Sequence, residues 1–194
     1  LSGVNELRLD PDTIASIFAG EITNWTDEAI TATNPGVTLP DTTITPVHRS
    51  DSSGTTEVLT DYLSATAPHV WTSEPDSDWP LEGGEAAQGT SGVLSAVRAA
   101  EGALGYADAS QAGTLPVAAV KVGDGYVDPT AEATGLIFAA STETEEPGMF
   151  VFTYDVDYAT TAADTYPIVL ISYLLACTKY DDTDEATMVQ GYLE

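Results

Sequence analysis

The side chains best suited to binding or chemistry lie in residues 48–58, which read His-Arg-Ser-Asp-Ser-Ser-Gly-Thr-Thr-Glu-Val. Arg49 is one of only five basic residues in a chain of net charge -26. Shortly after Arg49, serine and threonine residues flank Gly54, and residues 58–63 then show the apolar spacing of a helix. An arginine fork, hydroxyl donors and the positive end of a helix together bind tetrahedral oxyanions. The segment therefore predicts an anion site.

Two other interpretations of these residues stay open at this point. Ser53 and Thr55 have the types that cap a helix, and capping uses the same geometry as anion binding. His48 could form a Ser–His pair with Ser53, which would make the protein a serine hydrolase. However, residues 51–55 read Asp-Ser-Ser-Gly-Thr, so the G-x-S-x-G elbow is absent. The sequence therefore favours a binding protein over an enzyme.

Composition narrows the class of protein further. The 194 residues are 43% hydrophobic, which is enough to bury the core of one domain. With 31 acidic residues against five basic ones, the chain cannot neutralise a nucleic-acid backbone, so we expect no nucleic-acid partner. The acidity is typical of a solvated surface, and no stretch has the spacing of a calcium loop. Two histidines and one cysteine give no metal-ligand cluster, so we expect no metal and no cofactor.

The elements around residues 48–58 alternate between strand and helix. Asp10 and Pro11 predict a helix start and Gly20 its end. A strand is expected over 43–49 and a helix from about 54 to the residue before Pro68. The anion residues thus lie on a strand-to-helix connection, where exposed N–H groups meet the positive end of the helix dipole. Such α/β folds bind ligands at the carboxyl ends of strands.

The rest of the chain gives weaker signals. We expect a loop over 72–92, a helix over 92–100 capped by Thr90 or Ser91, a strand within 102–107 and a hairpin around residues 123–125. Helix signals over 130–165 are weak, including the Glu- and Thr-rich residues 141–146. The apolar run 167–176 predicts a buried strand with Cys177 in the core, and a helix begins near Asp184 and continues to Glu194.

Several segments together resemble the phosphate-binding proteins that serve ATP-binding-cassette (ABC) phosphate importers. The order and spacing of the matching parts are specific, and the match is dense over residues 9–110. The resemblance implies a periplasmic-binding-protein-like lobe, in which a central mixed sheet is flanked by helices and the ligand lies in a cleft between two lobes. The matching segments are 9–25, 34–40, 44–56, 61–63, 79–80, 89–97 and 102–106.

The resemblance also implies roles for single residues and partners. Arg49, Ser53, Gly54 and Thr55 would contact phosphate, and Asp51 would orient Arg49 through an ion pair. The family binds inorganic phosphate without turnover and delivers it to the permease subunits of an ABC transporter. Its members are extracytoplasmic, in the periplasm or at the cell surface, and are often lipid-anchored, so the resemblance implies a lipid anchor on the full-length protein. Another oxyanion in place of phosphate stays an open alternative.

The chain departs from the family in one large respect. The family's N-terminal segment, which forms most of the first lobe and supplies further phosphate donors, has no counterpart here. We therefore expect residues 1–165 to form the second lobe, and residues 166–194 to form a crossover strand and partial helix that return toward the first lobe. With half of the site, phosphate binding should be about millimolar or weaker.

Overall fold

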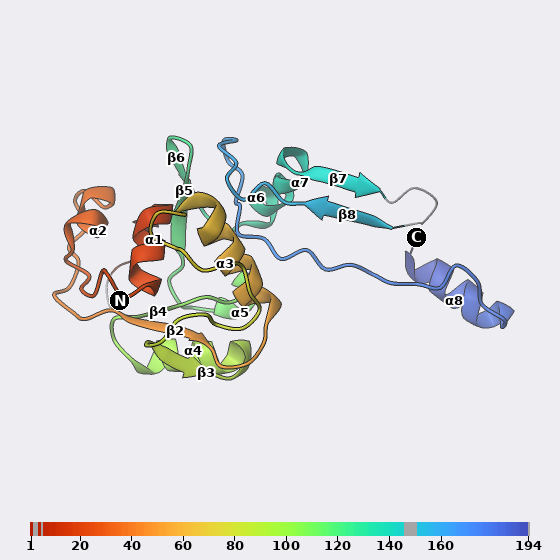
Figure 1. Cartoon of the computed structure of the whole chain (residues 1–194), viewed down its shortest axis with the longest axis horizontal. Helices are drawn as coiled ribbons and strands as arrows, with labels where there is room; N and C mark the ends of the chain where they lie inside the picture. Colours follow the sequence, from red (N-terminus) through yellow and green to blue (C-terminus); the bar gives the residue numbers. More distant parts are fainter. Residues whose placement is uncertain (2–3, 5, 146–150, 194) are drawn as a thin grey trace.

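The computed structural model describes residues 1, 4, 6–145 and 151–193, and Figure 1 shows their arrangement. The elements alternate between strand and helix over the first two thirds of the chain, as the sequence predicts. In chain order they are β1 (Leu7–Leu9), α1 (Pro11–Phe18), α2 (Glu28–Thr33), β2 (Thr45–Arg49), α3 (Gly54–Thr66), β3 (Glu85–Ala87), α4 (Gly89–Ala99), β4 (Ala103–Gly105), α5 (Ala109–Ala112), β5 (Ala118–Val122), β6 (Gly125–Val127), α6 (Ala131–Gly135), α7 (Ile137–Ala140), β7 (Thr142–Glu145), β8 (Phe152–Asp155) and α8 (Thr183–Leu193).

Within the described residues, the strands form two three-stranded sheets and a separate two-stranded ladder. In the first sheet, of order β1-β5-β6, β1 runs parallel to β5 and β6 returns antiparallel through the predicted hairpin. In the second, β2 lies between β3 and β4 and is parallel to both. The predicted α/β class is confirmed, and its mixed sheet is divided here between two smaller sheets.

Local signals in the sequence explain the first helix. The Asp10 side chain accepts the N–H of Thr13 at 2.8 Å and caps α1, while Pro11 occupies the first helical position. Gly20 follows the helix end with φ 76, a left-handed conformation that favours glycine. The predicted helix over 10–20 is therefore confirmed together with its start and stop residues.

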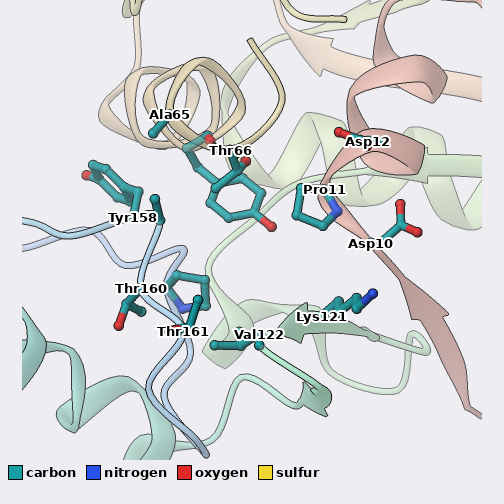
Figure 2. Close-up of a pocket in the computed structure, with 14 residues that line it drawn as sticks. Asp10, Pro11, Asp12, Ala65, Thr66, Lys121, Val122, Tyr158, Thr160 and Thr161 are labelled. Atoms are coloured by element: carbon teal, nitrogen blue, oxygen red, sulfur yellow. Dashed lines mark hydrogen bonds between the residues drawn. The ribbon is translucent and has the colours of Figure 1, made fainter. Parts of the chain in front are cut away.

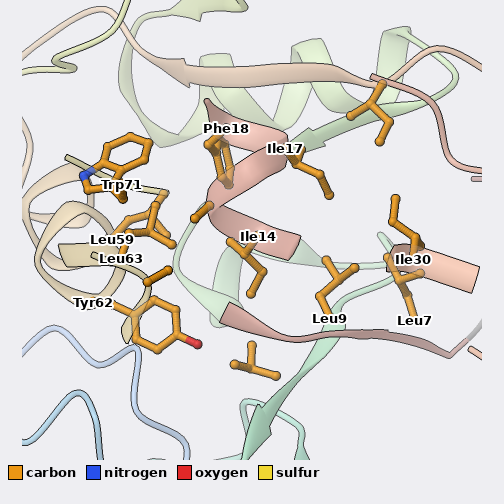
Figure 3. Packing of buried hydrophobic residues seen from close by; sticks show 14 of the residues in the cluster. Leu7, Leu9, Ile14, Ile17, Phe18, Ile30, Leu59, Tyr62, Leu63 and Trp71 are labelled. Atoms are coloured by element: carbon orange, nitrogen blue, oxygen red, sulfur yellow. The ribbon is translucent and has the colours of Figure 1, made fainter. Parts of the chain in front are cut away.

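The main core lies between α1, α3 and the first sheet. Apolar residues of α1 and α3 face one another across this core (Figure 3). The Trp25 indole, 1% exposed, donates from Nε1 to the carbonyl of Gly102 at 3.0 Å, which connects the loop after α1 to the turn before β4. Leu59, Tyr62 and Leu63 bring the middle and the C-terminal half of α3 into this core. Its labelled members in Figure 3 are Leu7, Leu9, Ile14, Ile17, Phe18, Ile30, Leu59, Tyr62, Leu63 and Trp71.

The region before α4 differs from the prediction. The helix begins at Gly89, and its N-cap is Gln88 without a side-chain hydrogen bond, so the predicted caps Thr90 and Ser91 are wrong. The expected loop also contains β3, a three-residue strand that pairs with β2. Both differences have one cause: pairing with β2 extends residues 85–87, and the chain then turns directly into the helix.

The C-terminal third departs furthest from the sequence analysis. The predicted buried strand over 167–176 is wrong, because the segment forms no ladder and Leu175 is 97% exposed. Cys177 is exposed and so is not a core residue. In Figure 1 this segment runs as an extended arm to α8, which buries no residue. The helix near Asp184 is confirmed, although its predicted end at Glu194 lies outside the described residues.

Residues 142–145 and 152–155 form strands, whereas the sequence weakly predicted helix there. They form the antiparallel ladder β7–β8, in which Thr144 lies opposite Thr153. Thr142 and Thr144 lie two residues apart and so share one face of this ladder, and β-branched residues such as threonine favour extended backbone. Residue 146, which the weak helical signal included, lies outside the described residues. Within the described ranges, no helix has the length and apolarity needed to cross a bilayer.

Candidate functional site

The predicted anion residues lie where β2 passes into α3. β2 is the central strand of its sheet and ends at Arg49, and the 13-residue helix α3 begins at Gly54. Between them the chain makes a short loop that ends at Ser53 in an extended conformation. The Ser53 hydroxyl accepts the N–H of Thr55 at 3.2 Å and so caps the helix. The predicted strand-to-helix connection is confirmed.

The Arg49 guanidinium is held between a carboxylate and two hydroxyls. Its Nε and Nη2 donate to the two Asp51 oxygens at 2.8 and 2.6 Å, and Nη1 donates to Ser53 Oγ at 2.7 Å. A longer contact of 3.5 Å joins Nη1 to Thr55 Oγ1. Counting the longer contact, these four contacts leave one of the five N–H donors of the fork, on Nη2, available for a ligand. The side chain is only 12% exposed, so its position is well defined.

Asp51 fixes Arg49 and also reaches the start of α4. Its Oδ1 accepts the backbone N–H of Gly89 at 3.0 Å in addition to the bond from Arg49. The hydrogen bond from Arg49, followed by that from Gly89, holds the pKa of the Asp51 carboxyl well below its usual range. The same bond raises the pKa of Arg49. Asp51 is therefore an ionised supporting residue, and its charge is already neutralised.

Tyr106 also belongs to this site, although the sequence analysis did not single it out. Its hydroxyl accepts the backbone N–H of Arg49 at 3.0 Å and lies 2.6 Å from the Thr56 hydroxyl. Burial raises the pKa of Tyr106. Val47 is paired with Gly105, so Tyr106 follows β4 at the same sheet edge where Arg49 ends β2. The sequence could have indicated Tyr106 only through its position directly after a strand, β4, that runs parallel to β2.

His48 does not form a pair with Ser53. Its ring is 8% exposed and stacks on Trp79, with 4.9 Å between ring centroids. Its Nδ1 lies 3.0 Å from the Arg49 carbonyl and its Nε2 lies 3.1 Å from the Gly83 carbonyl. The hydroxyl of Ser53 instead contacts Arg49 and Thr55. The geometry therefore gives no support to the serine-hydrolase alternative.

The start of α3 has a close neighbour from the C-terminal segment. A Cβ on Gly54 would lie 3.2 Å from Leu170 Cδ1, so glycine leaves room for this leucine. Beside this contact lies a mostly apolar cavity of about 500 Å³, and Thr55 is the one predicted site residue in its lining. Arg49, Ser53 and Gly54 therefore lie outside this cavity. Within the described ranges, no three potential acidic, histidine or cysteine ligands gather to hold a metal ion.

A family profile described as the PBP superfamily domain matches residues 2–194. The chain belongs to the PBP superfamily. Its α/β architecture, with an arginine at the end of a central strand and a helix beginning five residues later, agrees with the fold that the sequence motifs predict. The predicted resemblance to phosphate-binding proteins is confirmed by the similar proteins described next.

Among curated relatives of this PBP superfamily member, phosphate-binding protein PstS 3 of Mycobacterium tuberculosis is 34% identical over 198 residues, which cover 100% of this chain and 54% of the relative. Phosphate-binding protein PstS of Xylella fastidiosa is 34% identical over 177 residues, which cover 88% of this chain and 47% of that protein. The chain thus spans about half the length of the curated relatives it matches.

Two solved structures extend the comparison to the fold. A high affinity periplasmic phosphate-binding protein, PfluDING, bound with phosphate, has a TM-score of 0.54 and 26% identity, covering 71% of this chain and 40% of that one. A human phosphate binding apolipoprotein has a TM-score of 0.51 and 28% identity, and the match covers 72% of this chain and 42% of that one. The superfamily assignment therefore rests on both sequence and structure.

Proposed function

We propose that the chain binds inorganic phosphate at the start of α3. Arg49, Ser53, Gly54 and Thr55 would supply the donors, and Asp51 would hold the arginine in position. The observation that carries the proposal is the convergence of Arg49 Nη1, Ser53 Oγ and Thr55 Oγ1 at a helix N-terminus. Nη1 lies 2.7 Å from Ser53 Oγ, which lies 2.8 Å from Thr55 Oγ1.

The electrostatics of the junction suit an anion despite the acidic chain. The positive end of the 13-residue helix α3 and the charge of Arg49 point to the same place. Asp51 is paired with Arg49, so its negative charge is neutralised locally. Beyond about 8 Å, salt screens the remaining carboxylates at physiological ionic strength. Local donors rather than the net charge therefore decide whether an anion binds.

At the level of the whole protein, we propose an extracytoplasmic solute-binding protein that delivers phosphate to the permease subunits of an ABC transporter. The names of the relatives support the ligand, and PfluDING is described as periplasmic. In this proposal the protein performs no catalysis, and lipid anchoring holds the full-length form at the membrane. Residues 1–165 would be one lobe of the binding protein, and residues 166–194 would lead toward the other. Coverage of about half of each relative fits one lobe out of two, and the boundary near residue 165 is part of the proposal.

Calorimetric titration of the 194-residue chain with inorganic phosphate tests the proposal. Because one lobe would supply only part of the donors, we expect a dissociation constant of about 1 mM or weaker. Arg49→Ala should abolish the binding heat. Arg98→Ala is the matched control, because that exposed guanidinium contacts only the carbonyl of Ala112 among its described hydrogen bonds. Micromolar binding would refute the half-site proposal, and unchanged binding by Arg49→Ala would refute the assigned residues.

A further inference from the structure

The proposed anion site joins two elements whose relative position has to be fixed. Arg49 ends β2, whereas Ser53, Gly54 and Thr55 form the start of α3. Direct side-chain contacts between the two elements run from Arg49 Nη1 to Ser53 Oγ at 2.7 Å and to Thr55 Oγ1 at 3.5 Å. A bound anion would take up these same donors, so these contacts would weaken in the bound state. The site therefore needs a connection made by groups that the ligand does not use.

The two ends of α3 are held differently. Leu59, Tyr62 and Leu63 lie in the main core, and the last turn of the helix lines a second cavity of about 380 Å³ together with the start of α1 and the loop 158–161 (Figure 2). Thr56, in the first turn, is fully buried but is a polar residue outside the apolar core. The core therefore fixes the middle and the C-terminal half of α3, whereas the end that would meet the anion depends on polar contacts.

The Tyr106 hydroxyl makes a connection of the required kind. It accepts the backbone N–H of Arg49 at 3.0 Å and lies 2.6 Å from the Thr56 hydroxyl. The ladder between β2 and β4 ends with the pair Val47–Gly105, so the hydroxyl accepts the Arg49 N–H just beyond the last ladder pair. One oxygen atom thus contacts both the last residue of β2 and the first turn of α3. Neither contact uses a group that is proposed to bind the anion.

Aromatic packing sets the position of this hydroxyl. The Tyr106 ring is stacked 6.1 Å from the Trp79 ring and meets the Phe18 ring edge-on at 6.0 Å, both measured between centroids. Phe18 is a buried member of the main core, and Trp79 also stacks on His48, the residue before Arg49. Rings packed in this way have little freedom to move. The hydroxyl is therefore held at a defined point relative to the core.

We propose that Tyr106 is a positioning residue of the anion site, whose hydroxyl holds the end of β2 and the first turn of α3 together so that the Arg49 guanidinium and the N–H groups of α3 converge on one point. This inference rests on the proposed function. Burial raises the pKa of Tyr106, so the hydroxyl keeps a proton that it can donate to Thr56. Donors that are fixed in advance bind more tightly, because less ordering remains to be done on binding.

Tyr106→Phe keeps the ring and deletes the hydroxyl, so it tests the proposal directly. In the ¹⁵N-labelled chain without ligand, amide exchange with water should quicken by about tenfold or more at Arg49 and Glu57. Glu57 reports on the first turn of α3, because its N–H donates to the Ser53 carbonyl at 3.1 Å. Exchange of the Leu63 amide, in the main core, should quicken far less. This local pattern distinguishes a loosened junction from a general loss of stability.

Titration with inorganic phosphate at constant ionic strength gives the second measurement. Tyr106→Phe should bind phosphate about five- to tenfold more weakly than the unchanged chain, because the donors have to be ordered on binding. Thr33→Val is the matched control, since its hydroxyl donates to the Arg8 carbonyl at 2.9 Å and so joins α2 to β1 outside the anion site. It also deletes one hydroxyl bonded to a strand backbone, so it should lower the melting temperature comparably and keep the phosphate affinity within about twofold.

Thr56→Val takes the place of Tyr106→Phe if that variant fails to fold. It breaks the same connection from the side of α3 and leaves the aromatic packing of Tyr106 intact. Amide exchange at Glu57 should again quicken, and phosphate binding should weaken by about threefold or more.

Three results would overturn the positioning role. One is exchange of the Arg49 and Glu57 amides that is no faster in Tyr106→Phe than in Thr33→Val. Another is equal phosphate affinity in Tyr106→Phe and the unchanged chain, and the third is an equal loss of affinity in Thr33→Val. An unchanged chain that binds no phosphate would refute the proposed function alone, and the exchange of the Arg49 and Glu57 amides would then decide whether Tyr106 positions the junction.

Discussion

Ser53 has two roles in this account, and two substitutions separate them. Its hydroxyl caps α3 by accepting the Thr55 N–H at 3.2 Å, and it accepts Arg49 Nη1 at 2.7 Å. Ser53→Ala removes both bonds. Loss of the cap costs about 1 kcal/mol, and loss of an acceptor for a charged donor costs about 1.5–3 kcal/mol. Since both bonds share one oxygen, the free energy of unfolding should fall by about 2–3 kcal/mol.

Ser53→Asp should leave stability nearly unchanged, because aspartate is also a good N-cap and pairs with Arg49. It should nevertheless abolish phosphate binding, because its carboxylate occupies the place of the anion. Urea denaturation and thermal melting measure the stability of both variants. For a chain of this size each kcal/mol corresponds to about 2–4 °C, so Ser53→Ala should melt about 4–12 °C lower.

Ser52→Ala is the matched control. Its exposed hydroxyl contacts only that of Ser77 among the described side-chain bonds, so we expect a change within about 0.5 kcal/mol. A loss for Ser53→Ala no larger than this control would show that Ser53 does not cap the helix. Phosphate binding by Ser53→Asp equal to that of the unchanged chain would show that the anion does not lie at the start of α3.

Two further predictions concern acid stability and a glycine turn. The lowered pKa of Asp51 contributes stability that is present above the ordinary aspartate pKa and is lost as the pH falls through the lowered value. The difference in melting temperature between the unchanged chain and Asp51→Asn should therefore be largest near neutral pH and shrink below about pH 4. A difference that does not change with pH would refute the ion pair between Asp51 and Arg49. Gly102 has φ +83, and a Cβ there would overlap the Thr43 carbonyl oxygen, so Gly102→Ala should cost about 2–3 kcal/mol in urea denaturation. Gly135→Ala, with nothing within 4 Å of the added Cβ, is its control and should be neutral or slightly stabilising; equal effects of the two glycine substitutions would contradict this reasoning.

The part of the fold that positions the anion site could be predicted from local sequence signals. Asp10 and Pro11 start α1, and Ser53 starts α3, because side-chain caps and fixed proline geometry act within a few residues. The contacts of Arg49 with Asp51 and Ser53 are also local, since these residues lie within four positions of it. Their identities could therefore be read from one short segment, whereas their roles toward a ligand stay proposals.

Contacts between distant segments could not be predicted in the same way. Tyr106 reaches Arg49 only because β4 pairs with β2, and Gly89 reaches Asp51 only because α4 begins beside the loop. β3 has three residues with no apolar alternation, so only its ladder with β2 makes it a strand. The run 167–176 has strand composition, but a strand also needs a partner ladder, and Leu175 is almost fully exposed instead.

The most direct test of the central claim is an amide chemical-shift titration of the chain with inorganic phosphate. We predict saturable shifts of the Gly54 and Thr55 amides and of the Arg49 side-chain Nε–H, with an apparent dissociation constant of about 1 mM or weaker. These shifts should be absent from Arg49→Ala and retained by Arg98→Ala. Saturable shifts confined to other residues, or no shifts at the start of α3 at about 50 mM phosphate, would contradict the claim that these residues form an anion site.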